Sequence, residues 1–268
     1  MSDDITLAPA QPLPSTELRL DLRAGADPDA APEVTFRSEV TVELVRAAAR
    51  DADVVFAARV STQGEQTLAH VDDEADRSRG LINYLMRDRH GSPFEHNSMT
   101  FYVQAPIFVF REFMRHRIAS YNEESGRYRE LRPVFYVPGP QRKLVQVGKP
   151  GAYDFVDGTP EQSALVEAET KAACTQAYAA YQRMLAAGVA REVARIVLPV
   201  SIYSSMYVTM NARALMNFLS LRTKRDNATN PSFPQREIEM CAEQMERFWQ
   251  GLMPLTHAAF EANGRVAP

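Results

Sequence analysis

The sequence predicts a single α+β domain, and three observations favour this fold class. The chain has 268 residues, of which 45% are hydrophobic, so one core can bury about three-quarters of the chain's surface. Segments that alternate like strands and segments with helical periodicity follow one another irregularly, rather than as repeated β-α-β units. No G-x-G-x-x-G motif follows a predicted strand, which argues against a Rossmann nucleotide site.

The N-terminal segment differs in composition from the rest. Residues 1–35 are rich in Pro, Ala and Asp and lack apolar periodicity, so we expect a disordered or loosely ordered arm before a domain at residues 36–264. Ser2-Asp3-Asp4 places acid where a secretory signal carries base, and no run of about twenty apolar residues indicates a membrane span. We therefore expect a cytoplasmic protein that does not bind membranes.

The first half of the domain is expected to contain helices and one strand. Thr41 can cap a helix through Asp51, because its apolar residues would share one face. Asp53–Val60 is short and apolar and fits either a helix or a strand. Arg77–Arg89 has helical spacing and ends at His90-Gly91, and Met99–Val103 alternates like a strand.

The middle of the chain combines a polar segment with the longest predicted helix. Pro106 can open a helix that runs through Arg115-His116-Arg117. Tyr121–Tyr128 is rich in Asn, Ser and Gly and is expected to be a loop, whereas Val134–Val137 is expected to be a strand. In Pro160–Ala186, apolar residues recur at three- and four-residue spacing, which predicts a long helix.

The last part of the chain is predicted to be mostly helical. Ala190–Leu198 indicates a short helix that stops at a proline, and Val200–Thr209 is typical of a strand. Asn211 can cap the next helix through its side-chain oxygen. A polar, proline-containing insertion at Asp226–Pro234 is followed by a further helix at Gln235–Gln250.

Charge and cysteine content exclude several classes of function. The formal net charge is −4, with 30 basic and 34 acidic residues, whereas a general nucleic-acid binder normally has a basic excess. A positive patch must then be local, which favours a small anionic ligand. Cys174 and Cys241 are far apart and the five histidines are scattered, so the spacing indicates neither a metal site nor a disulfide framework.

The segment Arg115–Arg127 is the most informative part of the chain. It contains three arginines, a histidine, an asparagine, two serines and two glutamates within thirteen positions. Arginine presents a rigid fork of donors that suits phosphate, and Ser and Asn add neutral hydrogen bonds. An anion-binding site is therefore favoured over an amphipathic helix end rich in salt bridges, which stays open as the alternative.

The order of these residues resembles the signature R-H-R-x-x-S-x-N-x-x-S-x-R of the flavin-dependent thymidylate synthases (ThyX). Its fixed places are filled by Arg115, His116, Arg117, Ser120, Asn122, Ser125 and Arg127. Three further segments are similar to the family's other blocks, namely 90–96, 191–199 and 211–222. The four blocks occur in the family's order and cover roughly residues 40–260, which makes a chance match improbable.

The resemblance implies both a fold and a reaction. It implies a ThyX-like fold, with a central twisted sheet packed by long helices, that assembles as a homotetramer. The implied reaction is reductive methylation of dUMP to dTMP, with methylenetetrahydrofolate as carbon donor and FAD-bound hydride from NADPH. No cysteine nucleophile is implied, and Cys174 and Cys241 are interpreted as small buried hydrophobes.

The resemblance also assigns residues to dUMP. Arg222 is implied to be catalytic, because a guanidinium at the uracil edge would stabilise negative charge that develops on the ring. Without the resemblance, Arg222 could equally be a cation at a helix C-terminus. Ser125 is interpreted as a binding residue rather than a nucleophile, because no activating partner is visible. The implied dUMP residues are Glu112, Arg115, Glu123, Glu124, Ser125, Gly126, Arg127, Arg195 and Arg222.

A second, overlapping set is implied for FAD. Arg and His suit the pyrophosphate, and Asn suits the flavin or adenine edges. The set comprises His90, Ser92, Arg115, His116, Arg117, Glu123, Asn211, Arg213 and Asn217, and no metal ligand is expected.

Three local features of the sequence lead to separate expectations about contacts and ligand binding. Glu112 would repel a nearby phosphate unless it is paired, and Arg111 or Arg115 is the expected partner. Arg195 has an alternative as the ion-pair partner of Glu192, three positions earlier. Thr223–Pro234 is longer than the family pattern suggests and bears on how flavin and folate bind.

Two other functions remain open at this stage. The first is a nucleic-acid-binding protein that uses Arg115–Arg129 as a basic ridge, with tyrosines for stacking. The second is an FAD-dependent NADPH oxidase that lacks methylation, which would keep the flavin residues and fail with dUMP.

Overall fold

The structure is a computed structural model and describes residues 33–65, 75–149 and 152–268. Its centre is an antiparallel sheet in the order β2-β3-β8-β4. Strand β1 pairs in parallel with β5, and β6 and β7 form a hairpin. The strands are β1 (Thr35–Arg37), β2 (Thr41–Ala48), β3 (Ser98–Pro106), β4 (Ser120–Glu123), β5 (Val134–Tyr136), β6 (Val145–Lys149), β7 (Ala152–Val156) and β8 (Tyr203–Met210).

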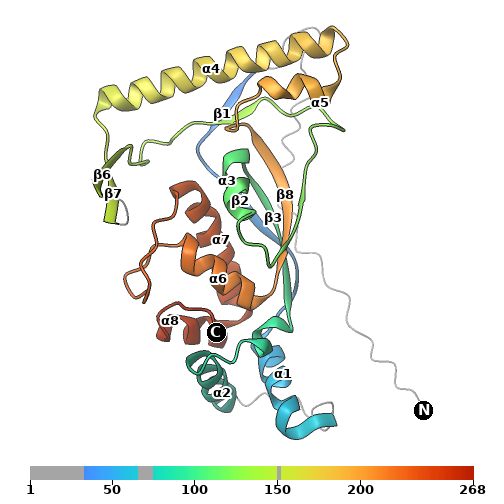
Figure 1. Ribbon diagram of the computed structural model, residues 1–268, viewed down its shortest axis with the longest axis vertical. Helices are drawn as coiled ribbons and strands as arrows, with labels where there is room; N and C mark the ends of the chain where they lie inside the picture. The colour runs from blue at the N-terminus through green and yellow to red at the C-terminus, as the bar shows by residue number, and fades with distance from the viewer. Residues whose placement is uncertain (1–32, 66–74, 150–151) are drawn as a thin grey trace, which may run out of the picture.

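The helices surround this sheet in three groups (Figure 1). The long helix α4 crosses the top of the view above α5, α6 and α7 lie along one side of the sheet, and α1, α2 and α8 gather at the opposite end from α4. The helices are α1 (Asp51–Gln63), α2 (Ala75–Arg87), α3 (Ile107–Phe113), α4 (Pro160–Ala186), α5 (Arg191–Ala194), α6 (Ala212–Arg222), α7 (Arg236–Leu252) and α8 (Pro254–Ala262), with 3₁₀ turns at Ser92–Glu95 and Arg195–Val197. No helix in the described ranges is long and apolar enough to span a membrane.

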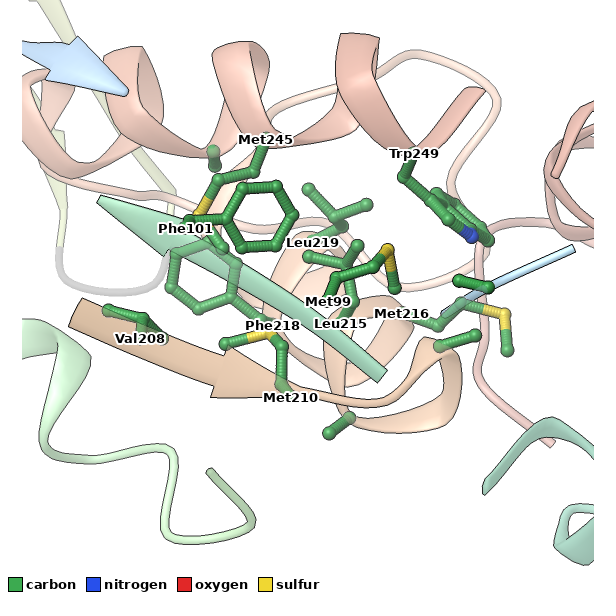
Figure 2. Packing of buried hydrophobic residues seen from close by; sticks show 14 of the residues in the cluster. Met99, Phe101, Val208, Met210, Leu215, Met216, Phe218, Leu219, Met245 and Trp249 are labelled. Carbon is green, nitrogen blue, oxygen red and sulfur yellow. The ribbon is translucent and has the colours of Figure 1, made fainter. Parts of the chain in front are cut away.

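The main core lies between the sheet and the helices α6 and α7 (Figure 2). Every second residue of β3 from Met99 to Ala105 is buried, as expected for a strand with one covered face. The facing side chains come from β3, β8, α6 and α7 and include Met99, Phe101, Val208, Met210, Leu215, Phe218, Leu219, Met245 and Trp249. This packing holds α6, and therefore both of its ends, in a fixed position against the sheet.

A smaller core lies under α4. It joins this helix to β5 and to the segment before β8, through Leu131, Phe135, Cys174, Tyr178, Tyr181, Ala194 and Ile202. Cys174 and Cys241 are both buried and unbonded to each other, which confirms their interpretation as small core residues. Burial raises the pKa of the Cys241 thiol, so it is a poor nucleophile.

The predicted helix from Thr41 to Asp51 is wrong, because Thr41–Ala48 forms strand β2. Val42 is buried and pairs with Val103 across the sheet, and the register shifts between Leu44 and Arg46. This β-bulge interrupts the period of two, and the interrupted pattern has apolar spacing similar to that of a helix.

Other expectations agree with the structure. The predicted helix Pro160–Ala186 is α4 with the same ends, and the predicted strand over residues 99–103 lies within β3. Asp53–Val60 is helical, as part of α1. The predicted arm lies outside the described residues as far as residue 32, while Thr35 already belongs to β1. Residues 265–268, beyond the predicted domain end, pack against it, since Arg265 is buried.

Candidate nucleotide and flavin site

The signature segment begins at the end of α3 and continues into an edge strand. Helix α3 ends at Phe113, so the prediction that it runs through Arg115-His116-Arg117 is wrong. The Tyr121 hydroxyl lies 2.8 and 2.7 Å from the carbonyl oxygens of Phe113 and His116, and the Phe113 carbonyl also accepts from the His116 amide at 2.9 Å, so these bonds fix the turn after the helix. The chain can therefore turn here into β4.

The predicted loop Tyr121–Tyr128 is partly wrong as well. Ser120–Glu123 forms β4 and pairs with β8, where Tyr121 lies opposite Val208. Pairing with an already formed strand outweighs the local preference of Asn and Ser for loops. The consequence is that the end of the signature is held rigidly beside the central sheet.

Arg222 ends α6 and meets the signature segment directly. Its Nη1 lies 2.6 Å from Glu112 Oε2, and its Nη2 donates to the backbone carbonyl oxygen of Glu112 at 3.3 Å. The expectation that Glu112 pairs with Arg111 or Arg115 is therefore wrong, because Glu112 pairs with Arg222. Arginine suits this position because its planar fork can hold several acceptors at once.

His116 completes this cluster. Arg222 Nε donates to His116 Nε2 at 3.0 Å, so that nitrogen is an acceptor and the neutral ring carries its proton on Nδ1. Burial, together with the charge of Arg222, lowers the pKa of His116 to about 4. The ring edge also packs on Phe218, with ring centroids 4.8 Å apart. His116 is thus neutral at physiological pH and turned toward Arg222.

A broad hollow of about 730 Å³ opens beside this cluster. Arg111, Glu112 and Arg115 line it, together with Gln235 from the start of α7. Within the described part of the chain, neither Arg115 nor the nearby Arg117 forms an ion pair. Exposed cations without carboxylate partners, in a chain with a net acidic charge, indicate a site for an anion.

A second hollow of about 270 Å³ adjoins the first, and Val200 lines both. It is lined by Glu123, Gly126 and Arg195, among others. A Cβ on Gly126 would lie 3.3 Å from Arg195 Cδ, so glycine permits the close approach of this arginine. Burial raises the pKa of Glu123, although the charge of Arg195 opposes part of that shift.

The Ser125–Arg127 turn lies at the rim of this hollow. The Arg127 amide donates to Ser125 Oγ at 3.3 Å, and Arg127 Nε lies 2.9 Å from Glu192 Oε2. Glu192 is therefore paired with Arg127, not with Arg195 as in the alternative considered above. Glu124 accepts from the Ser205 hydroxyl at 3.0 Å, and its other oxygen lies 3.0 Å from Arg129 Nε.

The remaining predicted residues gather at the other end of α6. Asn211 caps this helix as predicted, because its Oδ1 accepts from the Ala214 amide at 2.9 Å. Arg213 reaches Glu95 at 2.5 Å and the carbonyl oxygen of Pro268 at 2.6 Å. A Cβ at Gly91 would lie 2.5 Å from the Arg213 guanidinium carbon, so glycine lets this guanidinium take its present position, and a larger residue would make it move.

Three more predicted residues surround Arg213. Asn217 donates from its side chain to the Arg213 carbonyl oxygen at 3.1 Å. The His90 ring stacks on Tyr84, with centroids 5.6 Å apart, and Ser92 begins the 3₁₀ turn that contains Glu95. Since a helix rises about 1.5 Å per residue, Arg213 and Arg222 are roughly 13 Å apart along α6, a distance suited to an extended ligand.

The structure also shows residues that the sequence alone did not indicate. Gln235 and Val200 line the hollow beside Glu112, and Ser205 donates to Glu124. None of these three belongs to a recognisable motif, because each reaches the site only through the packing of the sheet or of α7. No sequence pattern points to these residues, and only their contacts in the structure identify them as part of the site.

Comparison with known proteins adds independent findings. The sequence model of the family described as thymidylate synthase complementing protein (Thy1) matches residues 43–255. The flavin-dependent thymidylate synthase of Streptomyces coelicolor is 70% identical over 238 residues, which cover 88% of this chain and 97% of that protein. The protein of the same description from Tropheryma whipplei is 64% identical over 233 residues, covering 87% of this chain and 97% of that protein.

A solved structure is similar over the same extent. The UMP/dUMP methylase PolB from Streptomyces cacaoi, bound with 5-Br dUMP, superposes with a TM-score of 0.83 at 58% identity. The match covers 88% of this chain and all of that one.

Proposed function

The chain belongs to the flavin-dependent thymidylate synthase family and methylates dUMP to dTMP with a bound flavin, and we propose that the flavin is FAD. NADPH as reductant and methylenetetrahydrofolate as carbon donor complete the proposal. The observation that carries it is the position of Arg222, held by Glu112 and His116 beside a hollow lined by Arg111 and Arg115, for which the described residues provide no ion-pair partner.

Arg222 is proposed to bind the uracil ring. A guanidinium has five N–H groups, and Glu112 and His116 use three of them. The remaining two, one on each Nη, are left to donate to O2 of uracil, the acceptor beside the N3–H group. A cation at that edge would stabilise the negative charge that develops on the ring when hydride arrives at C6.

Neutral His116 helps this role in two ways. It fixes the direction of the Arg222 fork through the Nε contact, and it adds no positive charge that would repel the guanidinium. The charge of Glu112 partly balances that of Arg222. Because the cluster is set by packing on Phe218, it is preorganised before substrate arrives.

The phosphate of dUMP is proposed to bind at the second hollow. Arg195 and the Ser125–Arg127 turn supply a cation, a hydroxyl and backbone N–H groups, which together make an anion cradle. Glu123 and Glu124 lie in the same stretch and are proposed to contact the sugar and its hydroxyl, as acceptors rather than as phosphate ligands.

The donor set around α6 fits FAD. Arg115 and Arg117, which form no ion pair in the described ranges, suit its pyrophosphate, and His90, Ser92 and Asn217 offer neutral donors and acceptors. When bound, FAD supplies the hydride. Asn211 and Arg213 are proposed to act mainly by fixing the start of α6 and the C-terminus, given their present bonds.

A homotetramer is proposed from the surface next to Arg195. Val193, Ile196 and Val197 are all substantially exposed there, and Ile196 is 76% exposed. Apolar side chains clustered at the rim of a site indicate a surface that another copy covers. A cytoplasmic location is proposed as well, since the proposed substrates are intracellular metabolites. Light scattering coupled to size-exclusion chromatography measures the assembly directly.

The central experiment is tritium release from dUMP labelled at C5, with NADPH and methylenetetrahydrofolate, by protein whose flavin is identified after extraction. We expect FAD and release that depends on all three substrates. NADPH oxidation without tritium release would instead favour the oxidase alternative. Because the chain belongs to a family of thymidylate synthases, we no longer retain the alternative that it is a nucleic-acid-binding protein.

A further inference from the structure

A separate cavity of about 240 Å³ lies between the β6–β7 hairpin and the segment that joins α6 to α7. Its wall is aromatic on one side. Tyr153 and Phe155 project from β7, and their ring centroids lie 5.9 Å apart. The Tyr153 ring also lies 5.1 Å from that of Phe233, and its hydroxyl donates to the Phe233 carbonyl oxygen at 3.3 Å. This side of the cavity offers ring surfaces suited to a flat ligand.

Four basic residues also line the cavity, against two carboxylates, Asp154 and Glu239. Two of its four basic residues are already committed to carboxylates. Arg142 lies 2.8 Å from the buried Glu237, and Arg236 contacts Glu239 at 2.9 Å. These two arginines therefore belong to the framework of the cavity.

The two lysines are available. Lys224 Nζ lies 3.4 Å from Asp154 Oδ1, and both side chains are more than half exposed, so this contact is weak. The Lys143 side chain forms no ion pair with any residue in the described ranges. Two lysines thus line the cavity together with the aromatic residues, and the carboxylate of Asp154 interacts with both of them without forming a short ion pair with Lys143 in the described ranges.

The cavity lies close to the proposed dUMP site. Lys224 follows Arg222 by two residues. The segment 233–236 separates the two spaces, since Phe233, Pro234 and Arg236 line the cavity while Gln235 lines the hollow beside Glu112. The segment Thr223–Pro234 therefore forms part of the wall between them.

We propose that this cavity binds one end of a co-substrate, namely an aromatic ring that carries an anionic group, with the ring on Tyr153 and Phe155 and the anion at Lys143 and Lys224. The volume is below the range of about 300–1,000 Å³ typical of sites that hold a whole small-molecule ligand, which favours one end of a larger molecule. The inference rests on the proposed function, because that function requires two co-substrates with such an end.

Both co-substrates share this chemistry. Methylenetetrahydrofolate ends in a p-aminobenzoyl ring joined to glutamate carboxylates, and NADPH ends in adenosine with a 2′-phosphate. In either case a charge-assisted bond to a lysine and a ring contact would act together.

The first test is direct binding of the isolated ends, p-aminobenzoyl-triglutamate and adenosine 2′,5′-bisphosphate, to the full-length protein by calorimetry. We expect one of them to bind about tenfold more weakly to the double variant Lys143→Gln/Lys224→Gln. Lys171→Gln is the matched control, because Lys171 lies on α4 and pairs with Glu167 away from the cavity. Equal affinities of wild type and double variant for both probes would overturn the proposal.

The second test uses kinetics to decide which co-substrate, methylenetetrahydrofolate or NADPH, occupies the cavity. In the tritium-release assay, the double variant should raise the KM for methylenetetrahydrofolate triglutamate or the KM for NADPH, while the KM for dUMP stays as in Lys171→Gln. A rise in neither co-substrate KM would contradict the assignment. If wild-type protein released no tritium at all, the proposed function would fail, and the calorimetric comparison would still decide whether the cavity binds either probe.

Discussion

Two clusters in this molecule contain the same three residue types, and their difference separates a structural arginine from a functional one. At the site, Arg222 lies with Glu112 and His116. Between α7 and α8, Arg265 lies with Glu246, and His257 bonds to the same carboxylate at 3.1 Å. Composition alone would assign both clusters the same role.

The Arg265 cluster is closed. The Arg265 side chain is 2% exposed and binds Glu246, Glu261 and the Thr223 hydroxyl. Burial raises the pKa of Glu246, but hydrogen bonds from His257 and Arg265 outweigh it and the pKa is lowered. Although Glu246, His257 and Glu261 are close enough to hold a metal ion, the Arg265 cation already binds both carboxylates.

The Arg222 cluster is open. Arg222 contacts a single carboxylate, and its histidine is a neutral acceptor instead of a carboxylate partner. Glu112 lines the adjoining hollow, so a ligand can reach the cluster. A buried arginine whose N–H groups are all paired stabilises the fold. An arginine beside a cavity that still has unused N–H donors can bind a substrate.

The largest effect is expected for Arg265→Met. Removing this cation leaves Glu246 with weaker partners, namely Arg225 at 3.5 Å and His257 at 3.1 Å, which should cost about 3 kcal/mol of the free energy of unfolding. Thermal denaturation should show a melting temperature lower by roughly 10 °C. Arg87→Met, at an exposed ion pair with Asp88, is the control and should shift it by less than about 1 °C. Equal shifts in both variants would show that the Arg265 cluster is not structural.

Arg222→Lys should affect activity instead of stability. Lysine keeps the charge but loses the planar fork, so it cannot hold Glu112 and His116 and also bind uracil. We expect kcat to fall by roughly 10²- to 10³-fold, the usual effect of losing one transition-state donor. Tritium release and thermal denaturation, measured together, test this. A loss of activity that merely followed a loss of stability would place Arg222 in the same class as Arg265.

His116 predicts a dependence of stability on pH. Its pKa is about 4 in the folded protein and 6.5 in the reference state, so between these values the unfolded chain binds the proton more readily. The stability due to neutral His116 is present above pH 6.5 and is lost as the pH falls toward 4. Urea unfolding at several pH values should show a smaller loss on acidification for His116→Asn. Identical pH profiles would mean that His116 is not buried in its neutral form.

The smallest effect is expected at the rim of the site. Arg127 and Glu192 are both about half exposed, and such a pair contributes little to stability. In Glu192→Gln, Arg127 is released toward the proposed phosphate position, so the KM for dUMP should fall by no more than about fivefold. Steady-state kinetics at fixed ionic strength measure this change. A higher KM would show that the ion pair positions Arg127 for binding.

Local sequence predicted those elements that depend on local interactions. Helix α4 has both ends as expected, because Thr159 caps it and its periodicity is regular. The cap of α6 at Asn211 was likewise visible in the sequence. Strand β2 was mistaken for a helix and β4 for a loop, because each is fixed by pairing with a strand distant in the chain, β3 and β8 respectively.

The sequence alone determined the family, the candidate residues and the expected chemistry, because the signature around Arg115–Arg127 depends only on the order of residue types. The tertiary structure decided which partners those residues have. It paired Glu112 with Arg222, turned His116 into a neutral acceptor, and gave Glu192 to Arg127. The physical reason is that an ion pair or a shifted pKa depends on burial and on neighbours distant in the sequence, 65 residues away for Arg127 and Glu192 and 106 for His116 and Arg222, which only folding brings together.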